Sequence, residues 1–173
     1  IPLHNNRIRI PGTLLVSAIS VIDDVSRCIT MDAKPVENSR FYFVGLRPGD
    51  AIETCLSDAR WLHGAVARLI ARGDTVLAAH DIGESGILPS LAEMAFAGQC
   101  GVEVTMSEPA LPLLTPLTTG YVLQCTRGDF AAEWATELPR SWVVELGRPA
   151  THQQFRYAGP GAPFEIDLAE LAA

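Results

Sequence analysis

The hydrophobic and polar residues of the chain fall into short and long blocks, which predict strands and helices in turn. Short apolar runs rich in β-branched and aromatic residues are typical of strands, and apolar residues at three- and four-residue spacing are typical of amphipathic helices. The pattern predicts strands at 13–22, 40–46, 75–79, 101–106, 121–125 and 141–146, followed by two more after 155. The helices that it predicts lie at 57–71, 87–97 and 129–138, with a final helical turn at 168–172.

The run TLLVSAISVI at 13–22 differs from the other predicted strands because it is almost continuously apolar. A strand that is apolar on both faces is typical of one that is covered on both sides. We therefore expect 13–22 to be a buried strand, preceded by an extended lead-in at 1–12. Together with the aromatic run at 40–46, it indicates apolar surface left over for a part of the protein outside this sequence.

The alternation of strands and helices predicts a single domain at 13–173 in the α+β class, with a layered mixed sheet flanked by helices. A chain of 173 residues with 48% hydrophobic and 19% charged residues favours a globular protein over a disordered one. The net charge of −7 gives no support for a nucleic-acid surface. No apolar run has the length of a membrane span. We therefore expect neither nucleic acid nor a membrane as a partner.

The cysteines indicate a reducing compartment. Cys28, Cys55, Cys100 and Cys125 are far apart, never form a CxxC pair and lie in largely apolar neighbourhoods. Free cysteines in such surroundings behave as small hydrophobic residues, and the ligand spacing of a zinc site is absent. The first residues also lack the pattern of a signal peptide. We therefore expect a cytoplasmic protein without a metal site.

The most distinctive polar stretch, at 80–86, lies between the strand predicted at 75–79 and the helix predicted at 87–97. Unpaired amides at a helix N-terminus favour an anion, so the stretch could face a phosphate or another substrate group. Its glycines, carboxylates and hydroxyl also suit an ordinary capped helix, with Glu84 or Ser85 as the cap. The candidate residues of this loop are His80, Asp81, Glu84, Ser85 and Gly86.

Charge decides between these two interpretations of the loop. The carboxylates of Asp81 and Glu84 would repel an anion unless a cation lay between them. A helix end contributes only about 0.3–1 kcal/mol at an exposed position, which one opposing charge could cancel. We therefore expect a structural loop in preference to an occupied phosphate site.

The residues also carry a resemblance to a known family. The stretch HDIGESGILPSLAEMAFAGQCGVEV at 80–104 resembles a family stretch that reads His-Asp-hydrophobic-Ser-Asp/Glu-Gly-Gly, followed by Leu-Ala-Glu-Met-Ala-Phe-Ala-Gly. The chain matches it at His80, Asp81, Glu84 and Gly86 and along 91–98. Over about residues 11–170 the chain resembles the C-terminal half of a synthetase module of the aminoimidazole ribonucleotide synthetase superfamily. Within that superfamily it is most similar to the second module copy of phosphoribosylformylglycinamidine synthase.

This resemblance implies an ATP-dependent ligase of purine biosynthesis, which converts formylglycinamide ribonucleotide and glutamine to the amidine. It implies ATP and Mg²⁺ as cofactors of the full enzyme, bound by the N-terminal half of each module, while the C-terminal half helps to wall the cleft. The family's catalytic residues and metal ligands lie mostly outside this stretch, so we assign none here. The fragment alone is expected to fold, to be inactive and to bind no cofactor. Its partners would be the N-terminal ATP-binding half and the rest of the parent enzyme.

Two departures from the family pattern bear on the loop. Position 83 is Gly where the family commonly has Ser, and position 85 is Ser where it has Gly. The segment LTPLTTG at 114–120 also lacks the acidic residue that commonly precedes the next strand. Both changes favour a supporting copy of the module over one that binds a phosphate ester.

Two alternatives stay open at this point. The chain could be a non-catalytic structural half-module that only packs against its partners. It could also be the C-terminal half of another ATP-using superfamily member, such as a thiamine-phosphate kinase, a selenophosphate synthetase or a hydrogenase maturation factor. The run MAFAGQCG at 94–101 favours the synthase over these branches.

Overall fold

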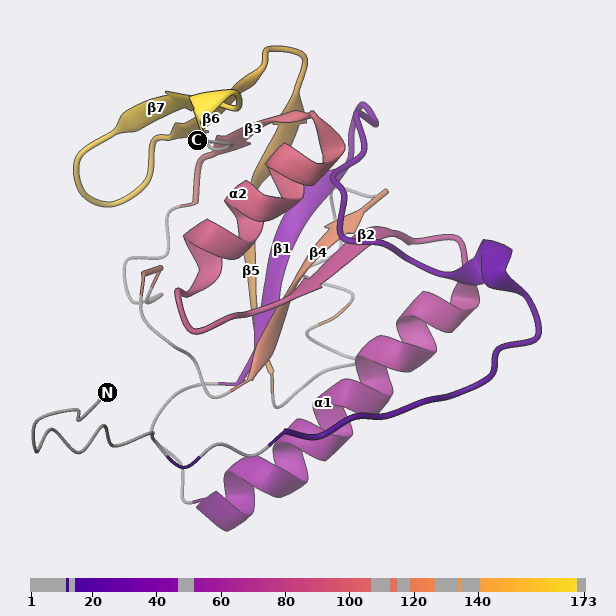
Figure 1. Cartoon of the computed structure of the whole chain (residues 1–173). Helices are drawn as coiled ribbons and strands as arrows, with labels where there is room; N and C mark the ends of the chain where they lie inside the picture. The colour runs from indigo at the N-terminus through magenta and orange to yellow at the C-terminus, as the bar shows by residue number, and fades with distance from the viewer. Residues whose placement is uncertain are drawn as a thin grey trace, which may run out of the picture.

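The computed structural model describes residues 12, 15–46, 52–106, 113–114, 119–126, 134 and 141–170. These residues form a seven-stranded sheet in the order β2-β4-β1-β5-β3-β6-β7, with α1 and α2 packed against opposite faces (Figure 1). Every strand pair is antiparallel except β3 with β6, which is parallel, so the mixed sheet expected from the sequence is confirmed.

The bounds of the elements follow the predicted order along the chain. The strands are β1 (Arg40–Gly45), β2 (Val76–Asp81), β3 (Gly101–Val104), β4 (Gly120–Cys125), β5 (Trp142–Ala150), β6 (Gln154–Tyr157) and β7 (Phe164–Asp167). The helices are α1 (Ile52–Arg72), α2 (Ile87–Gly98) and one turn of 3-10 helix, η1 (Val25–Arg27).

The core is divided into two layers by the central strand β1. Phe41 and Phe43 point into the layer beneath α2, whereas Tyr42 and Val44 point into the layer beneath α1. All four side chains are fully buried. Successive side chains of a strand face opposite sides, so one short apolar run supplies both layers. Burying each such side chain contributes about 1.5–3 kcal/mol, so β1 contributes substantially to both layers.

The helices predicted at 57–71 and 87–97 are confirmed, with one correction. Helix α1 begins at Ile52, five residues before the predicted start. On α2, Ile87 and Met94 are buried beneath the sheet, whereas Phe96 is 39% exposed. Of the helix predicted at 129–138 only Trp134, helical and buried, lies among the described residues.

The prediction of a buried strand at 13–22 is wrong for the residues that the structure describes. Residues 15–22 belong to no helix or strand and lie outside the sheet (Figure 1). Leu15 is 86% exposed, Ile19 98% and Val21 91%. The sheet already has β1 as its apolar inner strand, and no layer of the described structure covers either face of this run. The expectation of exposed apolar surface is therefore met by 15–22 itself. The lead-in at 1–12 lies outside the described residues except for residue 12, so its boundary stays a prediction.

A buried glutamine fixes the segment that leads into β1. Gln124, on β4, is fully buried. Its Oε1 accepts a hydrogen bond from the backbone N–H of Lys34 (2.7 Å), and its Nε2 donates to the Lys34 carbonyl (2.6 Å) and to Ser39 Oγ (2.9 Å). Next to it, the N–H of Ala33 donates to the Met94 carbonyl of α2 (2.9 Å). One side chain thus satisfies both backbone groups of a residue that belongs to no strand.

The cysteines of the described part are free thiols with different exposure. Cys100 and Cys125 are buried, as expected of small hydrophobic residues, whereas Cys28 is exposed, contrary to expectation. Burial raises the pKa of Cys125 to about 12. Within the described residues, no helix is long and apolar enough to cross a membrane.

Replacing Gln124 by leucine should destabilise the fold by about 2 kcal/mol or more, because each buried polar group left without a partner costs about 1–3 kcal/mol. Urea denaturation gives the free energy of unfolding. Gln153→Leu is the matched control, because Gln153 is exposed and donates only to the Gln99 carbonyl (2.9 Å). That control should change stability by less than about 0.5 kcal/mol. Equal losses in the two variants would contradict the role given to Gln124.

Candidate functional site

The candidate loop joins the end of β2 to the start of α2. Its first amide, that of Ile82, donates to the Gly120 carbonyl of β4 (3.0 Å), and the amide of Gly86 donates to the Gly83 carbonyl (3.2 Å). The cap of α2 is Gly86, with φ 93° and ψ −167° and no side-chain capping bond. The prediction that Glu84 or Ser85 caps the helix is therefore wrong.

Ser90 stabilises the turn before α2, where no side chain caps the helix. Its Oγ donates to the Gly86 carbonyl (3.1 Å) and accepts from the Gly83 amide (3.4 Å), and the residue is buried. The hydroxyl thus ties both ends of the turn to the first turn of α2. Sequence reasoning missed this residue, although a serine within the buried face of an apolar helix is a signal that could have found it.

The first amides of α2 are mostly committed within the protein. Leu88 donates its N–H to the Leu113 carbonyl (3.1 Å), and Ser90 donates its own to the Gly86 carbonyl (3.4 Å). Pro89, between them, has no N–H to offer. A helix end binds an anion through its unpaired amides, so this end has fewer of them than usual.

His80 is held against α2 rather than toward the tip of the loop. Its Nε2 lies 2.9 Å from Glu93 Oε2, and its Nδ1 lies 3.2 Å from Asp81 Oδ1. The imidazole side chain is only 14% exposed, while that of Asp81 is 81% exposed. Glu93 was not among the predicted residues, because nothing in the sequence pairs a strand end with the middle of the next helix. The contact links β2 directly to α2.

A second polar contact lies on the other face of the same strand end. In the sheet register Asp81 stands opposite Tyr121 of β4, whose hydroxyl hydrogen-bonds to Nδ1 of His63 on α1. The two rings meet edge to face with centroids 5.7 Å apart. Burial, and then the charge of Asp81, raise the pKa of Tyr121. His63 is exposed, but its ring has a specific partner in Tyr121.

Of the five predicted loop residues, the structure brings His80, Asp81 and Gly86 into contact with neighbouring elements, Asp81 through its place opposite Tyr121 of β4. Asp81, Glu84 and Ser85 are exposed. The φ of Ser85 is not positive, so the exchange of glycine and serine along this loop causes no strain there. Gly86 alone needs the freedom of a glycine in this loop.

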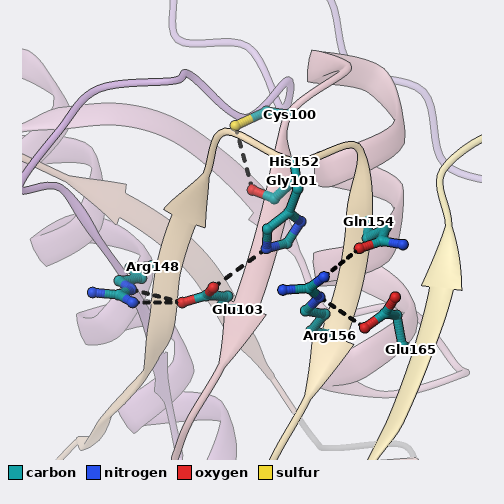
Figure 2. A network of polar contacts seen from close by, with 8 residues as sticks. All are labelled: Cys100, Gly101, Glu103, Arg148, His152, Gln154, Arg156 and Glu165. Carbon is teal, nitrogen blue, oxygen red and sulfur yellow. Dashed lines mark hydrogen bonds and ion pairs between the residues drawn. The ribbon is translucent and has the colours of Figure 1, made fainter.

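A larger polar network lies at the opposite end of the sheet, where β3, β5, β6 and β7 meet (Figure 2). Glu103 of β3 receives hydrogen bonds from Arg148 Nε (2.8 Å) and lies 3.3 Å from His152 Nε2. These partners, Arg148 first, lower the pKa of Glu103. Arg156 of β6 forms an ion pair with Glu165 of β7, with Arg156 Nε 2.8 Å from Glu165 Oε2.

The network borders a hollow of about 310 Å³ that also reaches the residues before β1. Arg148 faces the carboxylate of Glu103, and Arg40, at its edge, lies 3.4 Å from that of Glu145. The charges of these arginines are thus balanced within the protein, and the pairs join neighbouring strands. We interpret the network as a structural one, in which ion pairs hold neighbouring strands of the sheet together. None of its members was singled out from the sequence, and the pair of Glu103 with Arg148 joins strands that are far apart along the chain.

Comparisons with known proteins agree with the fold described above. Residues 56–133 match the family described as AIR synthase related protein, C-terminal domain. Human phosphoribosylformylglycinamidine synthase is 32% identical over an alignment of 146 positions, which covers 72% of this chain and 11% of the human protein. A probable membrane antigen 75 of equine herpesvirus 2 is 43% identical over 68 residues, which are 38% of this chain and 5% of that protein. The chain therefore spans only a small part of the relatives that it matches.

The structure of PurLQS from Thermotoga maritima has a similar fold, with a TM-score of 0.67 and 14% identity over 86% of this chain and 28% of that chain. Structures of T. maritima PurL complexed with ATP and with FGAR match with TM-scores of 0.64 and 0.65. Identity this low establishes the fold alone, and the fold is the one that the resemblance implied. Together with the sequence matches, it shows that the chain belongs to the AIR synthase related family through a domain of the C-terminal type, and that it is homologous to phosphoribosylformylglycinamidine synthase.

Proposed function

We propose that this chain is part of an ATP-dependent C–N ligase of the phosphoribosylformylglycinamidine synthase type. Such an enzyme converts formylglycinamide ribonucleotide and glutamine to the amidine in purine biosynthesis. The observation that carries the proposal is the 32% identity to the human synthase, because it extends over 72% of this chain. The T. maritima structures with ATP and FGAR support ATP as a cofactor of the whole protein, and the family resemblance adds Mg²⁺ to the proposal. A cytoplasmic location follows from the same proposal.

Within that enzyme we assign the chain a supporting role beside the N-terminal ATP-binding half and the rest of the parent protein. The polar groups at the end of β2 are engaged with this domain's own elements, such as His80 with Glu93 (2.9 Å). The Ser90 hydroxyl donates a hydrogen bond to the Gly86 carbonyl, and this bond stabilises the turn. A loop stabilised in this way can present a fixed wall to a cleft without supplying a reacting group.

The loop at 80–86 is accordingly a structural element in this proposal and not an occupied phosphate site. The amide of Leu88 is already bound by the Leu113 carbonyl (3.1 Å). Asp81 and Glu84 add exposed negative charge beside the remaining amides. Both features oppose an anion, since a helix end at an exposed position contributes only about 0.3–1 kcal/mol.

The second candidate is a non-catalytic structural half-module of the same parent enzyme, which only packs against its partners. It is favoured by one observation, namely that the groups at the candidate loop are largely paired within the domain. The two candidates differ in ligand contact, because only the first places a surface of this domain at the substrate cleft.

We expect the isolated chain to show no ATP turnover with Mg²⁺ and FGAR, because the proposal places the nucleotide and metal contacts mostly outside it. Release of inorganic phosphate is the measurement. The longer protein, assayed in parallel, should release phosphate only when FGAR and an ammonia source are present. Turnover by the isolated chain would overturn the supporting role, and an inactive longer protein would overturn the assignment to the ligase.

Gly86→Ala should destabilise the isolated chain by about 1–3 kcal/mol, because the backbone at this position lies in a region that is almost restricted to glycine. Gly83→Ala is the control within the same loop. Gly83 has no positive φ and no atom within 4 Å of an added Cβ, so its loss should be below about 0.5 kcal/mol. Thermal unfolding of the two variants checks this. Equal midpoints would mean that the loop does not depend on the Gly86 turn.

Titration with phosphate tests the structural loop directly. We expect the amide NMR signals of Glu84, Ser85 and Ile87 to stay unchanged by inorganic phosphate up to about 10 mM, a concentration at which even a weak millimolar site would be largely filled. Saturable shifts confined to these amides, and lost in a variant that adds charge at Ser85, such as Ser85→Glu, would establish an anion site. They would overturn the structural interpretation of the loop.

A further inference from the structure

Strand β7 forms one edge of the sheet and lies beside an apolar groove. It pairs with β6 on its inner side, and among the described residues no strand pairs with its outer side (Figure 1). The groove, of about 390 Å³, lies between the β6–β7 hairpin and α2. Phe96 of α2 and Phe164 of β7 line it and are 39% and 40% exposed. An unpaired strand edge beside an apolar groove is a surface on which an extended peptide can bind.

The backbone of β7 presents two residues to its outer side. The N–H of Leu168, just past the strand, donates to the Gln153 carbonyl, just before β6 (3.1 Å). In an antiparallel pair, successive residues direct their N–H and carbonyl groups to opposite sides. Ile166 therefore faces β6, as Leu168 does, whereas Glu165 and Asp167 direct their backbone groups outward. An added strand would form its hydrogen bonds with these two residues.

The side chains of β7 alternate between apolar and acidic. Phe164 and Ile166 line the groove. Successive side chains of a strand point to opposite faces, so Glu165 and Asp167 lie on the other face of the sheet. A neighbouring strand places its own side chains beside these, and opposite charges directly across from each other stabilise such a pair. The outer edge therefore suits a strand in which apolar residues alternate with basic ones.

Strand β6 already pairs with the inner side of β7 in this way. On the groove side, its Phe155 stacks on Phe164 with ring centroids 6.2 Å apart. On the other face, Arg156 Nε lies 2.8 Å from Glu165 Oε2 (Figure 2). The sequence QFRY of β6 is therefore an example, within the fold, of the kind of strand that β7 accepts.

The surface around this edge keeps a negative charge. Asp167 accepts a hydrogen bond from the neutral side chain of Gln154 (3.0 Å), and this contact leaves its charge unbalanced. Glu93 is the only charged residue among the described ones that line the groove. Its side chain is 62% exposed and lies 2.9 Å from His80. Glu170, just past β7, is also exposed. A cationic partner complements such a surface.

We propose that the outer edge of β7 and the groove bind an extended segment of another protein, in which apolar residues alternate with lysine or arginine. The backbone of that segment continues the sheet beyond β7. Its apolar side chains enter the groove, and its basic side chains lie beside Glu165 and Asp167. A second copy of this chain is a poorer occupant, because pairing β7 with β7 sets the carboxylates of the two copies against each other.

Binding of a synthetic peptide to this chain tests the proposal. The probe is a fluorescently labelled hexapeptide, Lys-Val-Arg-Phe-Lys-Val, and we expect its anisotropy to rise to saturation. A peptide of the same composition with its apolar residues grouped together should bind at least about 10-fold more weakly, because it cannot match both faces. A peptide with glutamate in place of the basic residues should also bind at least about 10-fold more weakly. Equal binding of the three peptides, or no binding of the first, would overturn the proposal.

Two substitutions at position 165 separate the backbone from the charge. The N–H of Glu165 faces outward, so Glu165→Pro removes a hydrogen bond to the added strand and none to β6. Glu165→Gln loses the same charge and keeps the N–H. The proline variant should bind the peptide at least about 5-fold more weakly than the glutamine variant, because it lacks one hydrogen bond. Equal affinities of the two variants would refute the addition of a strand.

Phe96→Gln tests the groove and leaves the strand intact. Phe96 lines the groove, whereas Ala97, its exposed neighbour on α2, does not. Phe96→Gln should weaken peptide binding at least about 5-fold, because it removes apolar surface that the bound peptide covers. Ala97→Gln is the matched control and should leave the affinity unchanged. Equal affinities of the two variants would mean that the peptide does not use the groove, and would contradict the proposal.

Two further measurements identify other occupants of the edge. The longer protein that contains this chain should bind the peptide with a similar affinity. Loss of binding there would mean that other parts of the longer protein cover the edge, and the proposal would be wrong. Dimerisation of the isolated chain that Glu165→Pro abolishes would assign the edge to a second copy and would also overturn the proposal. Neither outcome bears on the ligase assay, which tests the proposed function separately.

Discussion

The hydrogen bonds of Gln124 are the interaction on which the arrangement of this domain depends. The side-chain amide of a β4 residue satisfies the N–H and the carbonyl of Lys34 in the manner of a neighbouring strand. The chain can therefore cross the end of the sheet without being a strand itself. It then enters β1 between β4 and β5, the two strands with which β1 pairs. A fully buried amide tolerates no loss of these partners, since it would otherwise lie unsatisfied in the core.

The same crossing also joins the two layers. Ala33 donates its N–H to the Met94 carbonyl of α2, so the segment before β1 is fixed to the helix as well as to the sheet. Gly98 allows this approach, because a Cβ at that position would collide with the Ala33 carbonyl. At the other end of α2, Glu93 and Ser90 fix the loop that follows β2. The helix thus stabilises both the entry to the central strand and the candidate loop.

The sequence predicted the elements of this sheet better than their ends and contacts. The periods of the apolar residues were sufficient for β1, β2, α1 and α2, because burial on a single face or on alternate faces leaves a local pattern. The cap of α2 was not predicted, since Glu84 and Ser85 are good caps in general, while the turn through Ser90 is decided by tertiary packing. The contact of His80 with Glu93 was beyond sequence reasoning for the same reason. At 13–22 the apolar pattern indicated a segment that needs cover on both faces. The described part of the structure does not provide that cover.

The contacts of Arg27 and Lys34 have a consequence for how force passes through the molecule. The chain between the exposed segment 15–22 and β1 is attached first to the end of α1 by the Arg27 guanidinium and then to β4 by Gln124. Thr30 and Ala33 hold the same segment to β2 and α2, so it is fixed at several points and does not act as a hinge. A load on the exposed segment therefore reaches the axis of α1 before it reaches the central strand. Whatever covers that segment is mechanically coupled to the helix on one face of the sheet, while the candidate loop is tied to the helix on the other.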